Sequence, residues 1–297
     1  MVSFMIRIFC ALFLLSSGLL SAQDAQLRKE LETTYQSWRK SIQLKDPIAW
    51  RKVTAQHRQI SVKNRLLSER KKFPQAVFDL PAMPPGLGGL KHLGTVRRGP
   101  TAKSYYFGRV DFGLGGNPDK NLLALSFVGG QNAWKYDQME YVNLAAMPEV
   151  REQLDAGNLE YIKTNPDLQP TGQVPVTPVE VKEAPYIAKV YVFCPGREVQ
   201  VQVNQTSRHS FSNAQEAQLI IGGAQNGQNQ IQYAIKDLEE GLKDAMTVRV
   251  YLMSEVYGVK PIKIYEYLVK EGEKPLGFGK GTFMVDGSIR ARLMGKN

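Results

Sequence analysis

The chain has 297 residues, a formal net charge of +10 at pH 7, two cysteines and three histidines. Its length suits two domains of ordinary size. The histidines and cysteines share no metal-ligand spacing, so the sequence argues against a zinc site and predicts no metal and no other cofactor.

The first 22 residues are typical of a secretory signal peptide. Arg7 is followed by an apolar run over residues 8–15 and then by small residues, the order of regions that such a signal shows. We expect cleavage after Ala22. The alternative is an uncleaved anchor, because residues 4–22 approach the ~20 residues that cross a bilayer, and membrane contact would then be confined to this segment.

This segment bears on both compartment and disulfide chemistry. It predicts an exported protein of the periplasm, the cell envelope or the extracellular space. Cleavage would also remove Cys10, so that Cys194 is the one cysteine left and no intramolecular disulfide can form. Cys194 lies in an apolar run before Pro195, the setting of a buried, unreactive thiol.

Three amphipathic helices are predicted after the signal segment. The first begins near residue 27 and has an apolar stripe at three-and-four spacing, formed by Leu31, Tyr35, Trp38 and Ile42. Asp46 can cap a second helix, with Pro47 at its first position. A third helix is predicted over residues 60–72 and ends before Phe73 and Pro74.

Most of the net positive charge lies between Arg28 and Lys72, where few acidic residues accompany the lysines and arginines. A basic face of this kind can attract anionic lipid headgroups, acidic glycans or nucleic acid, and export argues against nucleic acid. The alternative is a solvated helical face that keeps the protein soluble.

Four strands are predicted after a loop rich in proline and glycine at residues 83–89. They cover residues 90–97, 101–112, 121–128 and 133–144, with glycine-containing breaks between them. Tight turns between consecutive strands predict an antiparallel sheet. We expect the helices to cover one face of this sheet, which gives an α+β domain.

Residues 126–137 read Ser-Phe-Val-Gly-Gly-Gln-Asn-Ala-Trp-Lys-Tyr-Asp. Together with helices that lead into a curved sheet, this segment resembles the closing hairpin of the cone-shaped nuclear transport factor 2-like superfamily. The resemblance covers about residues 25–145. It implies a cone-type fold with helices packed on a curved antiparallel sheet, in a superfamily that includes enzymes and binding proteins. It also implies that a homodimer can form through the open sheet face.

The C-terminal part changes periodicity. A short helix over residues 147–156 precedes a proline-rich linker at residues 158–185. Beyond it, alternating segments predict about seven short strands, at residues 187–194, 199–203, 218–221, 231–235, 248–252, 262–269 and 282–285. This pattern favours an all-β sandwich, either immunoglobulin-like or a jelly roll.

The predicted domains are therefore a signal peptide (1–22), an α+β domain (23–157), the linker (158–185) and a β-sandwich domain (186–297). Glycine-rich segments at residues 86–89, 113–116 and 277–281 lack the full dinucleotide and P-loop patterns. They predict turns. His209, in Ser-Arg-His-Ser, is expected in a polar loop.

Acid–base chemistry is one hypothesis for the first domain. A carboxylate in an apolar pocket has a raised pKa and can move protons near neutral pH. Asp111 and His92 are the candidates, and Tyr105 and Tyr106 are candidate hydrogen-bond donors to a developing oxyanion. The alternative is an exposed Asp111 paired with Arg109 or Lys103, as surface ion pairs often are.

The leading functional hypothesis is a non-catalytic, exported cell-envelope protein with a binding or scaffold role. Its partner would be a protein, a glycan or an anionic envelope polymer. The sandwich could present tyrosines to a glycan or a protein, namely Tyr251, Tyr257, Tyr265 and Tyr267. The rival hypothesis is a small-molecule enzyme of the isomerase or dehydratase type, with a pocket lined by Trp38 and Tyr106. No catalytic, cofactor-binding or metal-binding residue is assigned.

Overall fold

A computed structural model describes residues 2–113, 119–129, 133–238 and 244–296, with side chains from residue 23 onward. Contacts group the chain into two compact units. The first unit comprises Met1–Gln59 and Val77–Thr177, and the second comprises Ile60–Ala76 and Pro178–Asn297. The basic segment predicted between Arg28 and Lys72 is therefore divided between the two units. The predicted domain boundaries stay a prediction.

The first helix, α1 (Val2–Gln43), is longer than predicted, and α2 (Pro47–Val53) begins where predicted. The Asp46 carboxylate accepts hydrogen bonds from the backbone N–H groups of Ile48 (2.9 Å) and Ala49 (3.0 Å). This cap satisfies N–H groups that have no partner inside the helix. In the part of the chain described with side chains, no helix has both the length and the apolar character needed to span a membrane.

Helix α3 (Gln56–Ser68) begins and ends four residues before the predicted positions. Arg70 adopts a left-handed backbone conformation with φ 56°. The Lys71 N–H donates to the Leu66 carbonyl (2.8 Å) and the Arg70 N–H to the Leu67 carbonyl (3.2 Å), the pattern of a Schellman cap. The sequence does not predict that α3 ends here, because glycine usually occupies the position that Arg70 holds.

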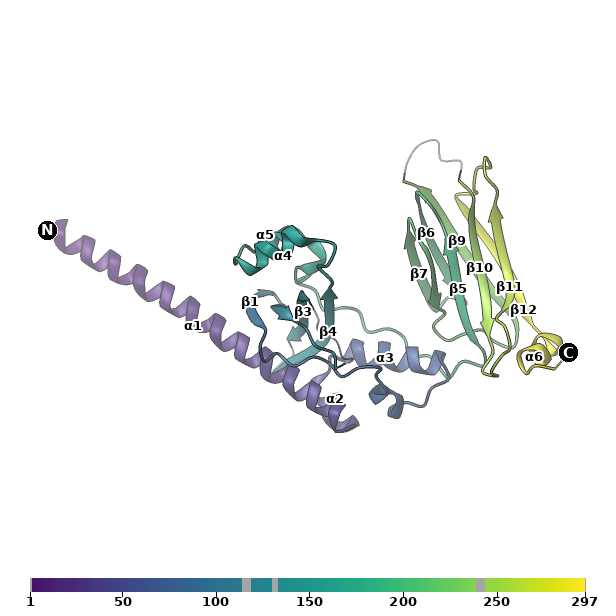
Figure 1. The fold of residues 1–297 in the computed structure, drawn as a ribbon, viewed down its shortest axis with the longest axis horizontal. Helices are drawn as coiled ribbons and strands as arrows, with labels where there is room; N and C mark the ends of the chain where they lie inside the picture. The colour runs from purple at the N-terminus through teal and green to yellow at the C-terminus, as the bar shows by residue number, and fades with distance from the viewer. Residues whose placement is uncertain (1, 114–118, 130–132, 239–243, 297) are drawn as a thin grey trace. The chain divides into compact units, whose positions relative to one another are not determined.

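The first unit contains one antiparallel sheet of order β1-β2-β3-β4. Its strands are close to those predicted: Lys91–Arg98 (β1), Thr101–Arg109 (β2), Lys120–Gly129 (β3) and Trp134–Val142 (β4). Helix α1 covers one face, where Leu31 and Tyr35 of its predicted stripe are buried in one cluster with Tyr106, Leu125 and Phe127. Trp38 is partly buried and packs against the same cluster. Consecutive antiparallel pairing confirms the predicted meander (Figure 1).

Helices also cover the other face of this sheet, which was not predicted. The opposite face packs against α4 (Pro148–Asp155), α5 (Glu160–Thr164) and the short 3-10 helix η2 (Pro166–Leu168). Ile162 and Leu168 are buried there. Strand β3 is buried along almost its whole length. Its side chains therefore contribute to apolar packing on both faces of the sheet. The first part of the predicted linker is therefore folded structure.

The second unit contains two four-stranded antiparallel sheets, of order β11-β10-β5-β8 and β12-β9-β6-β7 (Figure 1). The two sheets share one hydrophobic core. The strands are Ile187–Phe193 (β5), Arg197–Val203 (β6), Ser207–Ser212 (β7), Gln215–Leu219 (β8), Gly227–Asp237 (β9), Met246–Met253 (β10), Ile262–Val269 (β11) and Phe278–Val285 (β12). A C-terminal helix, α6 (Gly287–Leu293), follows.

Two predictions for this unit are wrong. His209 lies in β7, which was not predicted, because the strand is polar and its inward side chains include Ser207 and His209 beside Phe211. Residues 278–281 of the glycine-rich segment 277–281 lie in β12 rather than in a turn. In the segment 113–116, Gly113 has a left-handed φ of 71°, and the rest lies outside the described residues.

Within the second unit, the end of α3 holds the last part of the predicted linker. The Asn64 side chain donates to the Val179 carbonyl (2.8 Å) and accepts from the Val181 N–H (3.0 Å). The Ala184 N–H donates to the Leu67 carbonyl (3.0 Å). These bonds fix an extended segment that has no regular secondary structure of its own.

Candidate functional site

The residues considered for acid–base chemistry in the first unit do not converge. His92 lies on β1 and is half-buried, with Nε2 3.0 Å from Thr95 Oγ1 and 3.3 Å from Ser104 Oγ. Its ring is 5.3 Å from the ring of Tyr106. Burial, and secondarily the positive charge of Arg28, lower the pKa of His92. The ring is thus a packed member of a hydrogen-bond network.

Asp111 and Tyr105 lie elsewhere. Asp111 is exposed beyond the end of β2 and accepts a hydrogen bond from the Gly113 N–H (2.7 Å). Tyr105 lies on the sheet face opposite to that of Tyr106 and donates its hydroxyl to the Leu168 carbonyl. Burial raises the pKa of both tyrosines. Lys103 pairs with Glu140 rather than with Asp111.

The predicted pocket beside Trp38 is occupied by aromatic packing. The Trp38 ring lies 4.1 Å from the ring of Tyr136 and 5.8 Å from that of Tyr35. Together with Tyr106 and Phe127, these rings belong to the core between α1 and the sheet. The enzyme hypothesis gains no support from these residues.

A different group of side chains gathers on the outer face of the sheet β12-β9-β6-β7. Alternation along each strand turns valine, isoleucine and phenylalanine inward and leaves polar residues outside. The antiparallel register aligns the outward residues in two rows that each cross all four strands. The first row is Ser210, Gln200, Ala234 and Phe278, and the second is Arg208, Gln202, Gln232 and Lys280. We call this surface the glutamine face.

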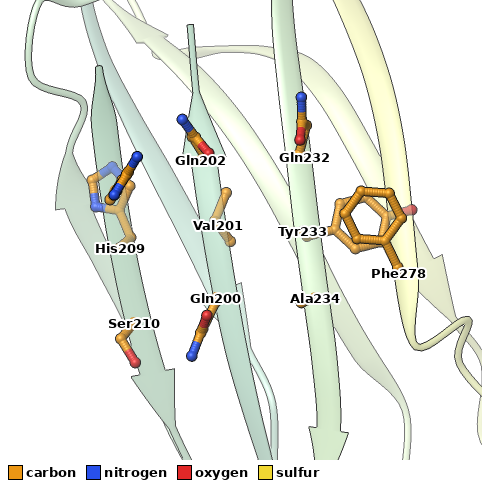
Figure 2. Close-up of a pocket in the computed structure, with 10 residues that line it drawn as sticks. Gln200, Val201, Gln202, His209, Ser210, Gln232, Tyr233, Ala234 and Phe278 are labelled. Carbon is orange, nitrogen blue, oxygen red and sulfur yellow. The ribbon is translucent and has the colours of Figure 1, made fainter. Parts of the chain in front are cut away.

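The glutamine face contains an open hollow of about 460 Å³. Figure 2 shows its lining on four neighbouring strands, from His209 and Ser210 on β7 to Phe278 on β12. Ala234 has the smallest side chain of the first row and leaves space between Gln200 and Phe278. At the end of this row, Phe278 is 55% exposed. The hollow thus combines amides, a hydroxyl, one guanidinium and an exposed aromatic ring.

The charge of the hollow is small. Among the described lining residues, Arg208 is the one charged side chain, because burial lowers the pKa of His209, and none is a carboxylate. A glutamine amide both donates and accepts hydrogen bonds, as a sugar hydroxyl does. An exposed aromatic ring provides an apolar surface for the C–H face of such a ligand. The arrangement is therefore suited to binding a neutral polyhydroxylated ligand.

The glycines of β12 make this face possible. Gly279 pairs directly with Tyr233 of β9, and a Cβ atom at Gly279 would overlap the Tyr233 ring. A Cβ atom at Gly281 would likewise overlap the ring of Tyr265, which belongs to the other sheet. The inward glycines leave room for two tyrosine rings, while Phe278 and Lys280 between them face outward.

His209 supports the glutamine face from inside. Its Nδ1 lies 3.0 Å from Gln218 Oε1 and its Nε2 lies 2.7 Å from Ser207 Oγ, while Ser207 Oγ also accepts the Ile221 N–H (2.7 Å). A neutral ring that donates from Nδ1 and accepts at Nε2 satisfies all three partners. Burial lowers the pKa of His209, which favours this neutral form. The residue is a structural link between β7 and β8.

The four tyrosines proposed for the sandwich do not form one surface. Tyr265 and Tyr267 pack against the core, and Tyr267 stacks on Tyr233 with a centroid distance of 4.5 Å. Tyr251 is half-buried, 6.5 Å from the ring of Tyr191. Tyr257 is fully exposed on its own. Cys194 is buried, as predicted, and burial raises the pKa of its thiol.

No family model, curated protein or solved structure matches this chain. The resemblance to the nuclear transport factor 2-like superfamily therefore stays a prediction. What the structure establishes is a mixed α and β chain with three antiparallel sheets in its described residues. The glutamine face is the candidate site that its geometry favours.

The depressed pKa of His209 predicts a loss of stability in mild acid. Above the reference pKa of 6.5, the ring is neutral in both folded and unfolded chains. Below that value the unfolded chain takes up a proton that the folded chain resists, so the free energy of unfolding falls as pH falls. We expect His209→Gln to show a smaller drop in Tm between pH 7.5 and 5.5 than the natural chain. Equal drops, measured by circular dichroism, would contradict this assignment.

Proposed function

We propose that this chain is an exported, non-catalytic protein of the cell envelope that binds a neutral oligosaccharide on the glutamine face. The finer architecture that we propose is a cone-type domain followed by a β-sandwich that carries this face. Export is supported by residues 1–22, which have the regions of a signal peptide. The binding role is supported above all by the two polar rows around the hollow at Ala234.

The chemistry of the rows favours an oligosaccharide. Gln200, Gln202 and Gln232 place three side-chain amides in one hollow. Nε2 of Gln200 donates to Glu198 Oε1 (3.2 Å) and Nε2 of Gln202 to the Gln205 carbonyl (3.0 Å), which leaves each of these amides one N–H and its carbonyl oxygen for the hydroxyls of a ligand. Four strands at a spacing of ~4.8 Å make each row about 14 Å across, which suits several linked sugars better than one. The open shape of the hollow suits a chain that continues beyond it.

The charge distribution separates this ligand from an anionic polymer. Arg208 and Lys280 are the cations of the second row, and neither has an acidic neighbour within the rows. Two exposed cations give a modest attraction that salt screens, whereas amide hydrogen bonds and aromatic contact are much less sensitive to salt. We therefore expect binding that persists at 0.5 M salt, a concentration at which the Debye length is roughly 5 Å.

The decisive experiment measures binding of the purified exported chain to a panel of neutral and uronic-acid-containing oligosaccharides. We expect saturable binding to neutral members, and Gln232→Ala should weaken it about tenfold, because one amide makes two hydrogen bonds of about 1 kcal/mol or less each. Gln228→Ala is the matched control, since Gln228 lies outside the hollow on the same strand and is exposed.

Isothermal titration calorimetry gives both affinities under one set of conditions. Binding restricted to acidic oligosaccharides and abolished by salt would favour the anionic-polymer hypothesis instead. Absence of binding to every neutral member, or equal effects of the two glutamine variants, would contradict the proposed role of the glutamine face.

A further inference from the structure

A second recess lies within the first unit, on the sheet face that carries α4 and α5. It has a volume of about 440 Å³ and lies between β2, β3, β4 and the segment 166–175. Three prolines of this segment line it, namely Pro166, Pro170 and Pro175. We call the segment the proline strap and the hollow beneath it the strap recess.

The proline strap is fastened to the sheet at several points. The Lys103 ammonium donates to the Asp167 carbonyl (2.6 Å), and Tyr105 donates its hydroxyl to the Leu168 carbonyl. Farther along, the Gly172 N–H donates to Thr101 Oγ1 (2.9 Å). The recess is therefore bounded by fixed structure on both sides, which favours a preformed ligand site.

The floor of the strap recess is a row of three residues on neighbouring strands. Lys103 on β2 pairs with Ser126 on β3, and Ser126 pairs with Gln138 on β4. The register then shifts, because Phe127 pairs with Tyr136 and leaves Asp137 as an extra residue. Such a β-bulge re-aims the side chains around it. Asp137 lines the recess, and its Oδ1 atom lies 2.8 Å from His57 Nε2.

Ser126 is the unusual member of this row. The residue is 7% exposed, and its hydroxyl has no hydrogen-bond partner among the described residues. A buried hydroxyl without a partner costs free energy of ~1 to 3 kcal/mol. Lys103 does not supply the missing bond, because its ammonium is directed to both Glu140 oxygens (3.0 Å each) and to the Asp167 carbonyl. The hydroxyl is therefore a polar group in the recess that a ligand can satisfy.

The charges of the recess indicate what kind of ligand fits. The charged lining residues are three carboxylates, Asp137, Glu140 and Asp167, and one ammonium, Lys103, which leaves a formal excess of two negative charges. This excess is notable in a chain with a net charge of +10. Since Lys103 is already engaged, the recess repels anions and attracts a cation.

We propose that the strap recess binds a small organic cation that carries a primary ammonium group on a short carbon chain. The ammonium N–H donates to Ser126 Oγ, and the excess carboxylates balance its charge. The carbon chain packs against the prolines of the strap. The site is independent of the glutamine face, which lies in the other unit.

The test uses the full exported chain and three probes that share a four-carbon chain: butylammonium chloride, sodium butyrate and 1-butanol. Calorimetry at constant ionic strength should show saturable binding of butylammonium alone. Ser126→Ala should weaken this binding by about tenfold, which corresponds to one hydrogen bond to a charged group. Asp167→Asn retains the backbone carbonyl that holds Lys103 and should weaken binding severalfold by removing one negative charge.

Two controls separate binding from folding. Ser37→Ala removes an exposed hydroxyl on α1 of the same unit and should leave the affinity for butylammonium unchanged. Ser126→Ala should keep or raise Tm, because it deletes an unpaired buried hydroxyl, and it should leave oligosaccharide binding unchanged. The proposal is overturned if butylammonium gives no saturable heat, if butyrate binds equally well, or if Ser126→Ala binds butylammonium as tightly as the natural chain.

Discussion

Ala234→Trp is expected to abolish oligosaccharide binding while the chain stays folded. Ala234 is exposed, lies at the centre of the first row and lines the hollow between Gln200 and Phe278. An indole at this position fills the space that a sugar ring would occupy. We expect the affinity to fall by more than about 100-fold, since a steric block of this kind costs several kcal/mol.

The matched control for this prediction is Ala217→Trp. Ala217 is an exposed strand residue on β8, in the sheet that does not carry the glutamine face. Tryptophan is favoured in strands, so both variants should keep a Tm close to that of the natural chain. Calorimetric titration should then show binding in Ala217→Trp and none in Ala234→Trp. Equal affinities would place the ligand elsewhere on the molecule.

Gly279→Val is expected to destabilise the second unit. The new side chain would overlap the buried Tyr233 ring, which is itself stacked on Tyr267. Overpacking of this kind lowers the free energy of unfolding by about 2 to 3 kcal/mol. Denaturation with urea, followed by circular dichroism, measures the difference.

Gly277→Val provides the comparison for Gly279→Val. A Cβ atom at Gly277 meets only the Ile235 carbonyl oxygen, at an ordinary distance of 3.9 Å. Both variants gain the same β-branched side chain two residues apart, so their difference isolates the contact with Tyr233. If Gly277→Val and Gly279→Val had the same stability, the inward direction of Gly279 would be wrong.

Much of the first unit could be predicted because its strand ends have clear sequence signals. Glycine, proline and asparagine interrupt the apolar runs, and β1 to β4 begin and end within three residues of the predicted positions. The Asp46 cap was predicted for the same reason. A helix over residues 147–156 was also predicted and corresponds to α4, but its packing on the sheet was not, because burial of β3 on both faces depends on where residues 148–168 return in space.

The candidate site was harder to predict for two physical reasons. The alternation of valine and glutamine at residues 199–203 was visible, but the neighbours of Gln200 and Gln202 come from residues 208–210 and 232–234 and from β12. Such a surface exists only once the strand order is known. In addition, two glycines close together in the sequence are typical of a turn. The tyrosine rings that pack against Gly279 and Gly281 explain why a strand contains both glycines.

The bonds at the end of α3 affect which fragments of the chain can fold and when the second unit can fold during synthesis. Ile60–Ala76 belongs to the same unit as residues that follow Thr177, so the first unit's residues 77–177 are inserted within the second. A fragment that begins at residue 178 would leave the backbone N–H groups of Val181, Ala184 and Gly222 without their partners on Asn64, Leu67 and Ser68. During synthesis, more than a hundred further residues must therefore be made after Ala76 before residues 60–76 can pack with the rest of the second unit.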